Sequence, residues 1–191
     1  MAVSNIARWD GSNWYPLGSG MNGAVTALVV MPNGDLVAGG DFTTAGGVPA
    51  SSIARWNGAS WSALGLGTNG NVEALTLLSD GSLAAGGGFS EAGGAPALFV
   101  ARWDGTNWWS LGFGVLSGWG VYALDALPNG GLVVGGEFTN AGGVNANYVA
   151  HWDGAVWSAL GSGTNDRVTS LKSLPNGDVV ASGYFNGPLI R

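Results

Sequence analysis

Hydrophobic residues along this chain come in short runs separated by turn-forming residues. Residues 24–31 are an apolar run, Pro-Asn-Gly-Asp follows, and residues 36–42 are a second apolar run. An Asn-Gly pair supplies the positive φ that a tight turn requires, so this stretch predicts a β-hairpin. After a loop rich in Gly, Pro and Ser, residues 53–57 and 61–65 alternate apolar and polar positions, which predicts a second hairpin. The two hairpins together predict a four-stranded antiparallel meander.

This four-stranded unit occurs four times, with copies that begin at Ile6, Ile53, Val100 and Val149. The third copy is two residues longer, and the additional residues fall in an expected loop between blades at residues 112–120. No segment has the apolar spacing of a helix, so the chain is predicted to be all-β. Repeated sheets of this size are typical of a β-propeller, in which blades pack face to face and bury their apolar surfaces. We expect one domain, residues 1–191, with four four-stranded blades; a β-sandwich and a β-solenoid are alternatives.

The order of features within each unit resembles kelch repeats and the related galactose-oxidase-type propeller. The second strand ends in a Gly-Gly pair, and a tryptophan follows the second turn. The Gly pairs are Gly39-Gly40, Gly86-Gly87 and Gly135-Gly136, and the late tryptophans are Trp14, Trp61, Trp108 and Trp157. Two features depart from kelch: the earlier aromatic, usually tyrosine, is Trp9, Trp56, Trp103 or Trp152, and the fourth copy has Ser182-Gly183. The resemblance implies the fold and not the activity, because the copper-radical chemistry of the oxidase needs a set of histidines, tyrosines and a cysteine that this chain cannot supply.

The fourth unit supplies the first two strands of a blade, and residues 5–18 supply the last two. Strand complementation between the two ends would therefore complete the blade, and an unpaired sheet edge would otherwise promote aggregation. Closure within one chain gives a four-bladed monomer, and closure between two chains gives an eight-bladed homodimer. Small Gly-Gly segments fit the smaller rotation per blade of the larger ring, which favours the homodimer.

The composition of the chain argues against some classes of binding partner. The net charge is −6, only 9% of residues are charged, and Lys172 is the single lysine, so we expect no nucleic-acid partner. The chain has no cysteine, no apolar run long enough to span a membrane and no signal-peptide pattern at its N-terminus, so no membrane insertion is expected. Its polar surface comes mainly from Ser, Thr and Asn, which is compatible with an extracellular or virion surface.

Ten tryptophans raise the question of a ligand-binding surface. Eight of them recur at fixed positions of the repeat, which indicates packing residues. Trp109 and Trp119 break the pattern, and Trp119 lies in the expected inserted loop, where no repeated packing role applies. We therefore predict Trp119 as a ligand contact, together with Tyr122 and Phe113.

The first strand of each unit is expected to line the central channel of a propeller. These strands keep Val and Leu at matching positions but vary between them, and the variable residues Glu73, Asp125 and Lys172 are predicted to line the channel. Asp125 and Lys172 occupy equivalent positions of successive blades, so we expect them to form a structural ion pair.

Catalysis has little support in the sequence. His151 is the single histidine and takes the place of Arg8, Arg55 and Arg102 of the other copies, so we interpret it as a polar strand residue that faces Glu137. No serine occupies a nucleophile-elbow motif, and the acidic residues in the turns do not form the ladder of a calcium loop. We predict no enzymatic activity, no cofactor and no metal site.

These observations favour a non-catalytic propeller scaffold that binds a protein partner as an interaction or structural module. The alternatives are a lectin-like module that binds glycans, suggested by Trp119 and Tyr122, and an excised or engineered piece of a larger propeller.

Overall fold

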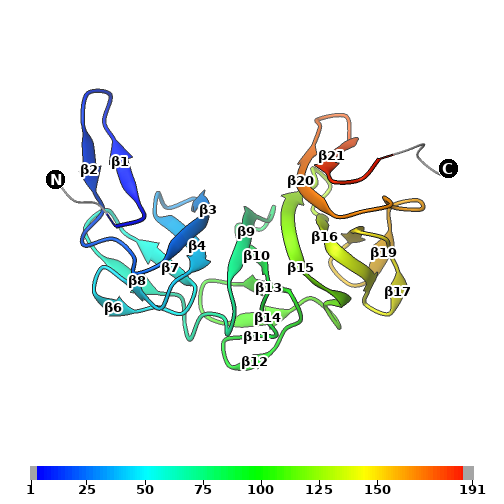
Figure 1. Cartoon of the computed structure of the whole chain (residues 1–191), viewed down its shortest axis with the longest axis horizontal. Coiled ribbons are helices and arrows are strands. Elements are labelled where there is room, and N and C mark those ends of the chain that lie inside the picture. Colours follow the sequence, from blue (N-terminus) through cyan, green and yellow to red (C-terminus); the bar gives the residue numbers. More distant parts are fainter. Residues whose placement is uncertain (1–3, 187–191) are drawn as a thin grey trace.

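The computed structural model describes residues 4–186, which form strands, turns and loops. Three antiparallel sheets, two of four strands and one of five, follow one another along the chain and are arranged as an open arc (Figure 1). A two-stranded hairpin precedes them, and another follows them. Among residues 4–186, no helix is long and apolar enough to cross a membrane. The all-β prediction is confirmed.

Each of the three sheets is one blade, and its strands follow chain order from the concave to the convex side of the arc. The first blade contains β3 (Ala24–Val30), β4 (Leu36–Asp41), β7 (Ile53–Trp56) and β8 (Trp61–Ala63). The second contains β9 (Val72–Leu77), β10 (Leu83–Gly87), β13 (Val100–Trp103) and β14 (Trp108–Ser110). The third contains β15 (Val115–Ala126), β16 (Leu132–Ala141), β18 (Val149–Trp152) and β19 (Trp157–Ala159).

The Gly-rich loop of each blade folds into a small hairpin of its own. These short strands are β5 (Thr44–Ala45), β6 (Val48–Pro49), β11 (Glu91–Ala92), β12 (Ala95–Pro96) and β17 (Val144–Asn145), the last of which pairs with the extended end of β16.

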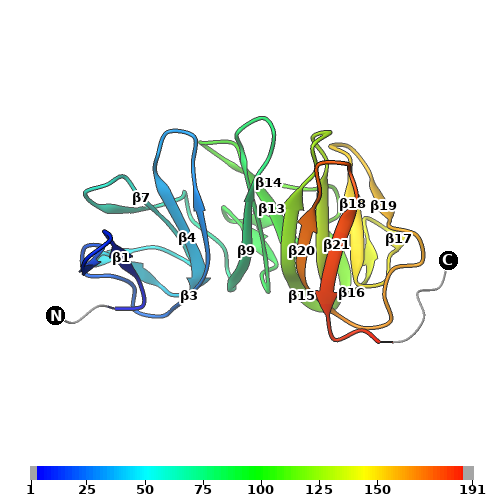
Figure 2. The ribbon, with the colours of Figure 1, turned by 90° about the horizontal axis from the view of Figure 1, so that it is seen from above.

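The two terminal hairpins are half-blades. They are β1 (Ala7–Trp9) with β2 (Trp14–Pro16), and β20 (Val168–Ser173) with β21 (Val179–Gly183). They form separate two-stranded sheets and lie at opposite ends of the arc in both views (Figures 1 and 2). The described residues thus form three complete blades and two halves, not a closed four-bladed ring. The expected junction also involves residues 1–3 and 187–191, which lie outside the described part of the chain.

The concave side of the arc is formed by the first strand of each unit. Strands β3, β9, β15 and β20 contact one another in succession (Figure 1). The first glycine of each Gly-Gly pair permits this close approach: a Cβ placed on Gly39 would lie 2.5 Å from Cγ1 of Val72 in the next blade. Gly86 and Gly135 face Val121 and Val168 in the same way, at 2.4 and 2.6 Å. The first glycine of each pair is therefore required for close packing of the blades.

Tryptophans join consecutive blades on the outer side. The indole Nε1 of Trp61 donates a hydrogen bond to the Leu17 carbonyl of the preceding unit at 2.8 Å, and Trp108 does the same to Leu64 at 2.9 Å. Trp157 repeats the bond to Leu111 at 2.8 Å. These three indoles are only 5–8% exposed, as expected for packing residues.

The earlier tryptophan of each copy stacks obliquely against the later one. In the three complete blades the ring centroids are 5.2–5.4 Å apart, within the range for attractive aromatic pairs. The pair in the first hairpin has the same geometry at 5.5 Å, but Trp9 is 50% and Trp14 64% exposed. The packing role is therefore confirmed for three pairs and unfulfilled for the first.

Trp108→Phe tests the interblade hydrogen bond. The change removes the indole donor and leaves part of its volume unfilled, so we expect the free energy of unfolding to fall by about 1–2 kcal/mol in a urea titration. The control is Trp109→Phe, because Trp109 is adjacent but 55% exposed and bonded to the exposed Asp104. Equal losses in the two variants would contradict the role given to the Trp108 bond.

Candidate functional site

The third blade is longer than its neighbours. Strand β15 has 12 residues and β16 has 10, whereas the equivalent β9 and β10 have 6 and 5. The two additional residues therefore extend a strand pair and do not form the loop expected from the sequence. The pairing register shifts between Gly118 and Gly120, and Gly120 has φ of +148°, which marks an irregularity in β15. This irregularity contains Trp119.

Trp119 is one of the most exposed apolar side chains of the described residues, at 78%. Beside it lies a shallow hollow of about 340 Å³. Its lining consists of Gly118, Trp119, Glu137, Phe138, Thr139 and Tyr148. We call this surface the Trp119 hollow. Its backbone is held by the β15–β16 ladder, so the indole is presented from a strand and not from a free loop.

Glu137 connects the Trp119 hollow to a group of charged and aromatic residues. Its Oε2 accepts a hydrogen bond from the Tyr122 hydroxyl and lies within 3.4 Å of Arg167 Nη1, which comes from the next unit. The Arg167 guanidinium in turn lies over the Tyr184 ring, with its carbon 4.1 Å from the ring centroid. This geometry is a cation–π contact, which fixes the guanidinium over the ring.

The titration of this group is set by its contacts. Burial raises the pKa of Tyr122, and the charge and hydrogen bond of Glu137 raise it further, so the phenol stays protonated and donates. Although partial desolvation acts in the opposite direction, the Glu137 contact raises the pKa of Arg167 above its ordinary value. The Tyr122 phenol and the Arg167 guanidinium therefore both keep their protons near neutral pH.

The structure brings some of the sequence-predicted ligand residues together and separates another. Trp119 and Tyr122 share β15, and both border Glu137. Phe113 is also 78% exposed, but it lies in the turn before β15 and is not among the residues that line the Trp119 hollow. Phe113 is therefore not placed beside the Trp119 hollow.

Glu137, Arg167 and Tyr184 were not among the predicted site residues. They come from non-equivalent positions of the repeat, so comparison of the copies does not group them. One signal was present: Arg167 is a basic residue outside the repeated Arg-Trp positions.

The predicted inner-strand residues lie on β9, β15 and β20. Glu73 is bonded to Asn71, and its charge acts on Tyr122 across the neighbouring strands. Lys172 Nζ lies 2.9 Å from Asp125 Oδ1, so the expected ion pair is present. That these residues line a closed channel remains a prediction.

Asp125 is anchored more firmly than its lysine partner. Its side chain is 12% exposed, whereas that of Lys172 is 71% exposed. Ser173 donates to the other carboxylate oxygen from both its backbone N–H and its hydroxyl. Burial alone would raise the pKa of Asp125, but the hydrogen bonds from Lys172 and Ser173 outweigh it and hold the pKa below its ordinary value.

His151 is placed differently from the expectation. It pairs across the sheet with Val133, and Glu137 pairs with Gly120, so the predicted contact between His151 and Glu137 is wrong. Its Nδ1 is 3.4 Å from the Ser158 hydroxyl, and its Nε2 is buried without a hydrogen-bond partner. Among residues 4–186, no three His, Asp or Glu side chains are grouped in a way that could hold a metal ion.

Comparisons with known proteins agree with this architecture. A family described as "Domain of unknown function (DUF5122) beta-propeller" matches residues 32–58 and 127–150, which are the same part of the first and third units. None of the curated proteins compared with the chain matches it. Among solved structures, the WD40 beta propeller domain of Doa1 is similar, with a TM-score of 0.55 and 17% sequence identity. The match covers 84% of this chain and 48% of that chain, so this chain spans about half of that propeller's length.

The fold is therefore that of a β-propeller. The similarity does not distinguish kelch from other propeller repeats, and it leaves the number of blades in the closed ring open.

Because Asp125 accepts hydrogen bonds from Ser173 and Lys172, we expect its side chain to make a pH-dependent contribution to the free energy of unfolding. Asp125→Ala should lower the free energy of unfolding at pH 7 by about 1–3 kcal/mol, because it removes the acceptor of Ser173 and Lys172. Lys172→Met should cost less than about 1 kcal/mol, because its ammonium is mostly solvated.

The sign of the pH effect follows from the lowered pKa of Asp125. Its charged form contributes fully above the unfolded-state pKa of about 3.9, and this contribution is lost as the pH falls through the lower folded-state pKa. Urea titrations between pH 7 and pH 2 should show the gap between wild type and Asp125→Ala narrowing only at the acidic end. A gap that is constant over this range would contradict the assignment.

Proposed function

We propose that this protein is a non-catalytic propeller scaffold, built from kelch-like repeats, that binds a protein partner at the Trp119 hollow. The observation that carries the proposal is the exposed Trp119 indole, which shares a hollow with Glu137, the carboxylate that pairs with Arg167. Exposed aromatic residues next to arginine are the side chains that dominate binding energy in protein interfaces.

Rigid placement supports this function. Trp119 is held in a strand, Glu137 is held by two partners, and Arg167 rests on Tyr184. A surface that is already ordered loses little conformational entropy when a partner binds. We propose that a partner segment places an apolar or basic side chain against the Trp119 indole and a polar group against Glu137.

The state of the titratable groups supports binding over catalysis. Glu137 is engaged by Tyr122 and Arg167, and the raised pKa of Tyr122 keeps its proton in place near neutral pH. General acid–base catalysis works best with a group whose pKa lies near the operating pH. His151 is remote from this cluster in the sheet register, opposite Val133.

One observation favours a glycan as a second candidate ligand. The Trp119 hollow combines an exposed indole face with the carboxylate of Glu137 and the ring of Tyr148. A flat apolar face beside hydrogen-bonding groups suits a sugar ring, which has one apolar face and a polar rim.

Trp119→Ala tests the site. Its indole is largely exposed, so we expect fold stability to change by less than about 0.5 kcal/mol. Enrichment of peptides from a displayed library should fall at least tenfold, as expected for the loss of an interface anchor. Phe113→Ala is the matched control, because Phe113 has the same exposure and lies away from the hollow.

The same two variants separate the candidate ligands. Glycan-array binding that Trp119→Ala abolishes and Phe113→Ala retains would favour the glycan. Peptide enrichment with the same pattern supports the protein partner, and equal effects of the two variants would refute the Trp119 hollow as the site.

A further inference from the structure

Both ends of the arc present half a blade. Within residues 4–186, β1 pairs only with β2, and β21 pairs only with β20. Exposed apolar side chains concentrate on these two hairpins and on β3. They are Trp9, Trp14 and Tyr15 on the first hairpin, Leu28 and Val30 on β3, and Leu174, Val180 and Tyr184 on the last hairpin or its turns.

We infer that the β1–β2 hairpin of one copy completes the blade that β20–β21 begins in a second copy, so that two copies close one ring of eight blades. The inference concerns assembly and does not depend on the Trp119 hollow as a binding site. Its basis is an interface that occurs in each complete blade of the chain.

The register of this junction follows from the first blade. There β4 pairs with β7, with Leu36 opposite Trp56 and Val37 opposite Arg55. Strands β21 and β1 occupy the equivalent positions of the repeat, so Val179 lies opposite the second copy's Trp9 and Val180 opposite the second copy's Arg8. The chain that leads into β1 is already in the required conformation: Asn5, two residues before the strand, has φ of +63°, and its counterparts have φ of 61° to 64°. These counterparts are Ser52, Phe99 and Tyr148.

An apolar hollow lies where the inference places Trp9 and Trp14 of the second copy. It measures about 250 Å³ and lies between the third blade and the last hairpin. Its lining includes Leu127, Val133, His151, Leu160 and Val179. The equivalent hollow between the second and third blades is walled additionally by Trp152 and Gly154, which are the counterparts of Trp9 and Gly11. A second copy's hairpin would thus supply the missing wall.

The space beside one glycine of each unit indicates the same position for the second copy's tryptophan pair. The Cβ position of Gly112 lies 3.3 Å from Trp152 and 3.6 Å from Trp157, and Gly18 and Gly65 face their tryptophan pairs in the same way. The equivalent Gly161 has no neighbour within 4 Å. Trp9 and Trp14 of a second copy would occupy this position, and Trp14 Nε1 would donate to the Leu160 carbonyl as the other late tryptophans donate to their leucines.

Charges at the junction are complementary. In the first blade the turn residue Asp35 lies 3.5 Å from Arg55. In the second blade Ser82 takes the position of Asp35 and accepts a hydrogen bond from Arg102, and Asp80, two residues earlier in the turn, lies 2.7 Å from the same arginine. The third blade has Gly131 and His151 at the positions of Asp35 and Arg55. The fourth unit retains the acid as Asp178, and its matching arginine is Arg8, on the first hairpin.

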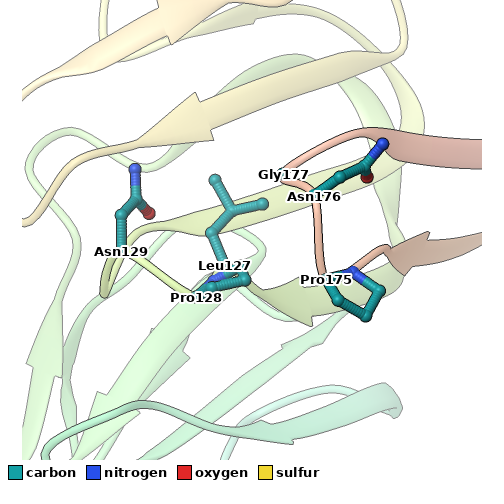
Figure 3. Close-up of a pocket in the computed structure, with 6 residues that line it drawn as sticks. All are labelled: Leu127, Pro128, Asn129, Pro175, Asn176 and Gly177. Carbon is teal, nitrogen blue, oxygen red and sulfur yellow. The ribbon is translucent and has the colours of Figure 1, made fainter.

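The turn that carries Asp178 is already formed. Asn176 Nδ2 donates to Asp178 at 2.7 Å, as Asn33 does to Asp35 at 2.9 Å. Figure 3 shows Pro175, Asn176 and Gly177 of this turn across from Leu127, Pro128 and Asn129 of the third blade. The six residues line a hollow of about 260 Å³. The acid is therefore positioned to meet an arginine without rearrangement of the turn.

One residue makes this junction looser than the internal interfaces. Ser182 replaces the first glycine of the Gly-Gly pair, and its Cβ would face Val25 of the second copy as Gly39 faces Val72. At Gly39 a Cβ would lie 2.5 Å from the valine methyl, so the blades at the junction must stand slightly farther apart. Ser182→Gly should therefore tighten the assembly.

Two findings favour a second copy over closure within one chain. The two hairpins lie at opposite ends of the arc (Figure 2). The match to the WD40 propeller covers 84% of this chain and 48% of that chain, so residues 1–191 correspond to about half of that structure.

The first measurement is the mass of the wild-type chain by light scattering at micromolar concentration. We expect about twice the 19.2 kDa of one chain. A species of 19.2 kDa would overturn the inference, and so would assemblies larger than two copies, because these would mean that the ring does not close with two.

A charge-swap experiment tests the junction itself. Arg8→Asp and Asp178→Arg each place two like charges at both junctions, so each variant alone should dimerise at least tenfold more weakly. A mixture of the two variants restores one Arg–Asp pair at each junction and should recover the dimer. Rescue by mixing is expected only for contacts between chains; a weakened dimer without rescue would overturn the assignment of the pair.

Trp14→Ala and Ser182→Gly give opposite expected effects on the dimer. Trp14→Ala should weaken dimerisation at least tenfold, and Ser182→Gly should strengthen it. Trp109→Ala is the matched control, since Trp109 is 55% exposed against 64% for Trp14 but occupies a complete blade. Far-ultraviolet circular dichroism confirms that each variant is folded. A dimer unaffected by Trp14→Ala would contradict the inference, and binding at the Trp119 hollow should persist in every variant.

Discussion

The contact between consecutive blades is the constraint on which this molecule depends. Each sheet has only four or five strands and cannot bury its own faces, so its stability comes from the sheets on either side. Two features make the contact close enough. A glycine lets the second strand approach the valine of the next blade, and a tryptophan reaches back to the leucine carbonyl of the preceding unit. One feature acts near the inner side of the arc and the other near its outer side.

The sequence predicted those parts of the fold that recur. Because the copies align, the strands, the turns, the Gly-Gly pairs and the packing tryptophans could be assigned by comparing one unit with the next. The Asp125–Lys172 pair could also be predicted, since both residues occupy the same position in successive units and such positions are neighbours around the arc.

The sequence was a poorer guide to structure in the third unit, where the chain departs from the repeat. Two additional residues with Gly on both sides of Trp119 are compatible with a loop, and only the partner strand shows that they lengthen β15. Glu137, Arg167 and Tyr184 meet through the twist and packing of different strands, and no periodicity relates them. His151 was assigned the wrong neighbour because the sequence does not reveal the register, which places Val133 opposite it.

The interblade tryptophan bond also has a direction. In the bonds made by Trp61, Trp108 and Trp157, the indole donates toward the N-terminal side and the leucine carbonyl accepts from the C-terminal side, so a unit has one donor face and one acceptor face. Duplication or deletion of a whole unit leaves both faces unchanged at the ends of the array. The contacts between blades therefore determine how neighbouring units pack but not how many units the array contains. The number of blades in a closed ring depends instead on the angle between consecutive blades. A lineage of such proteins could change its number of blades by recombination between repeats without inventing a new interface.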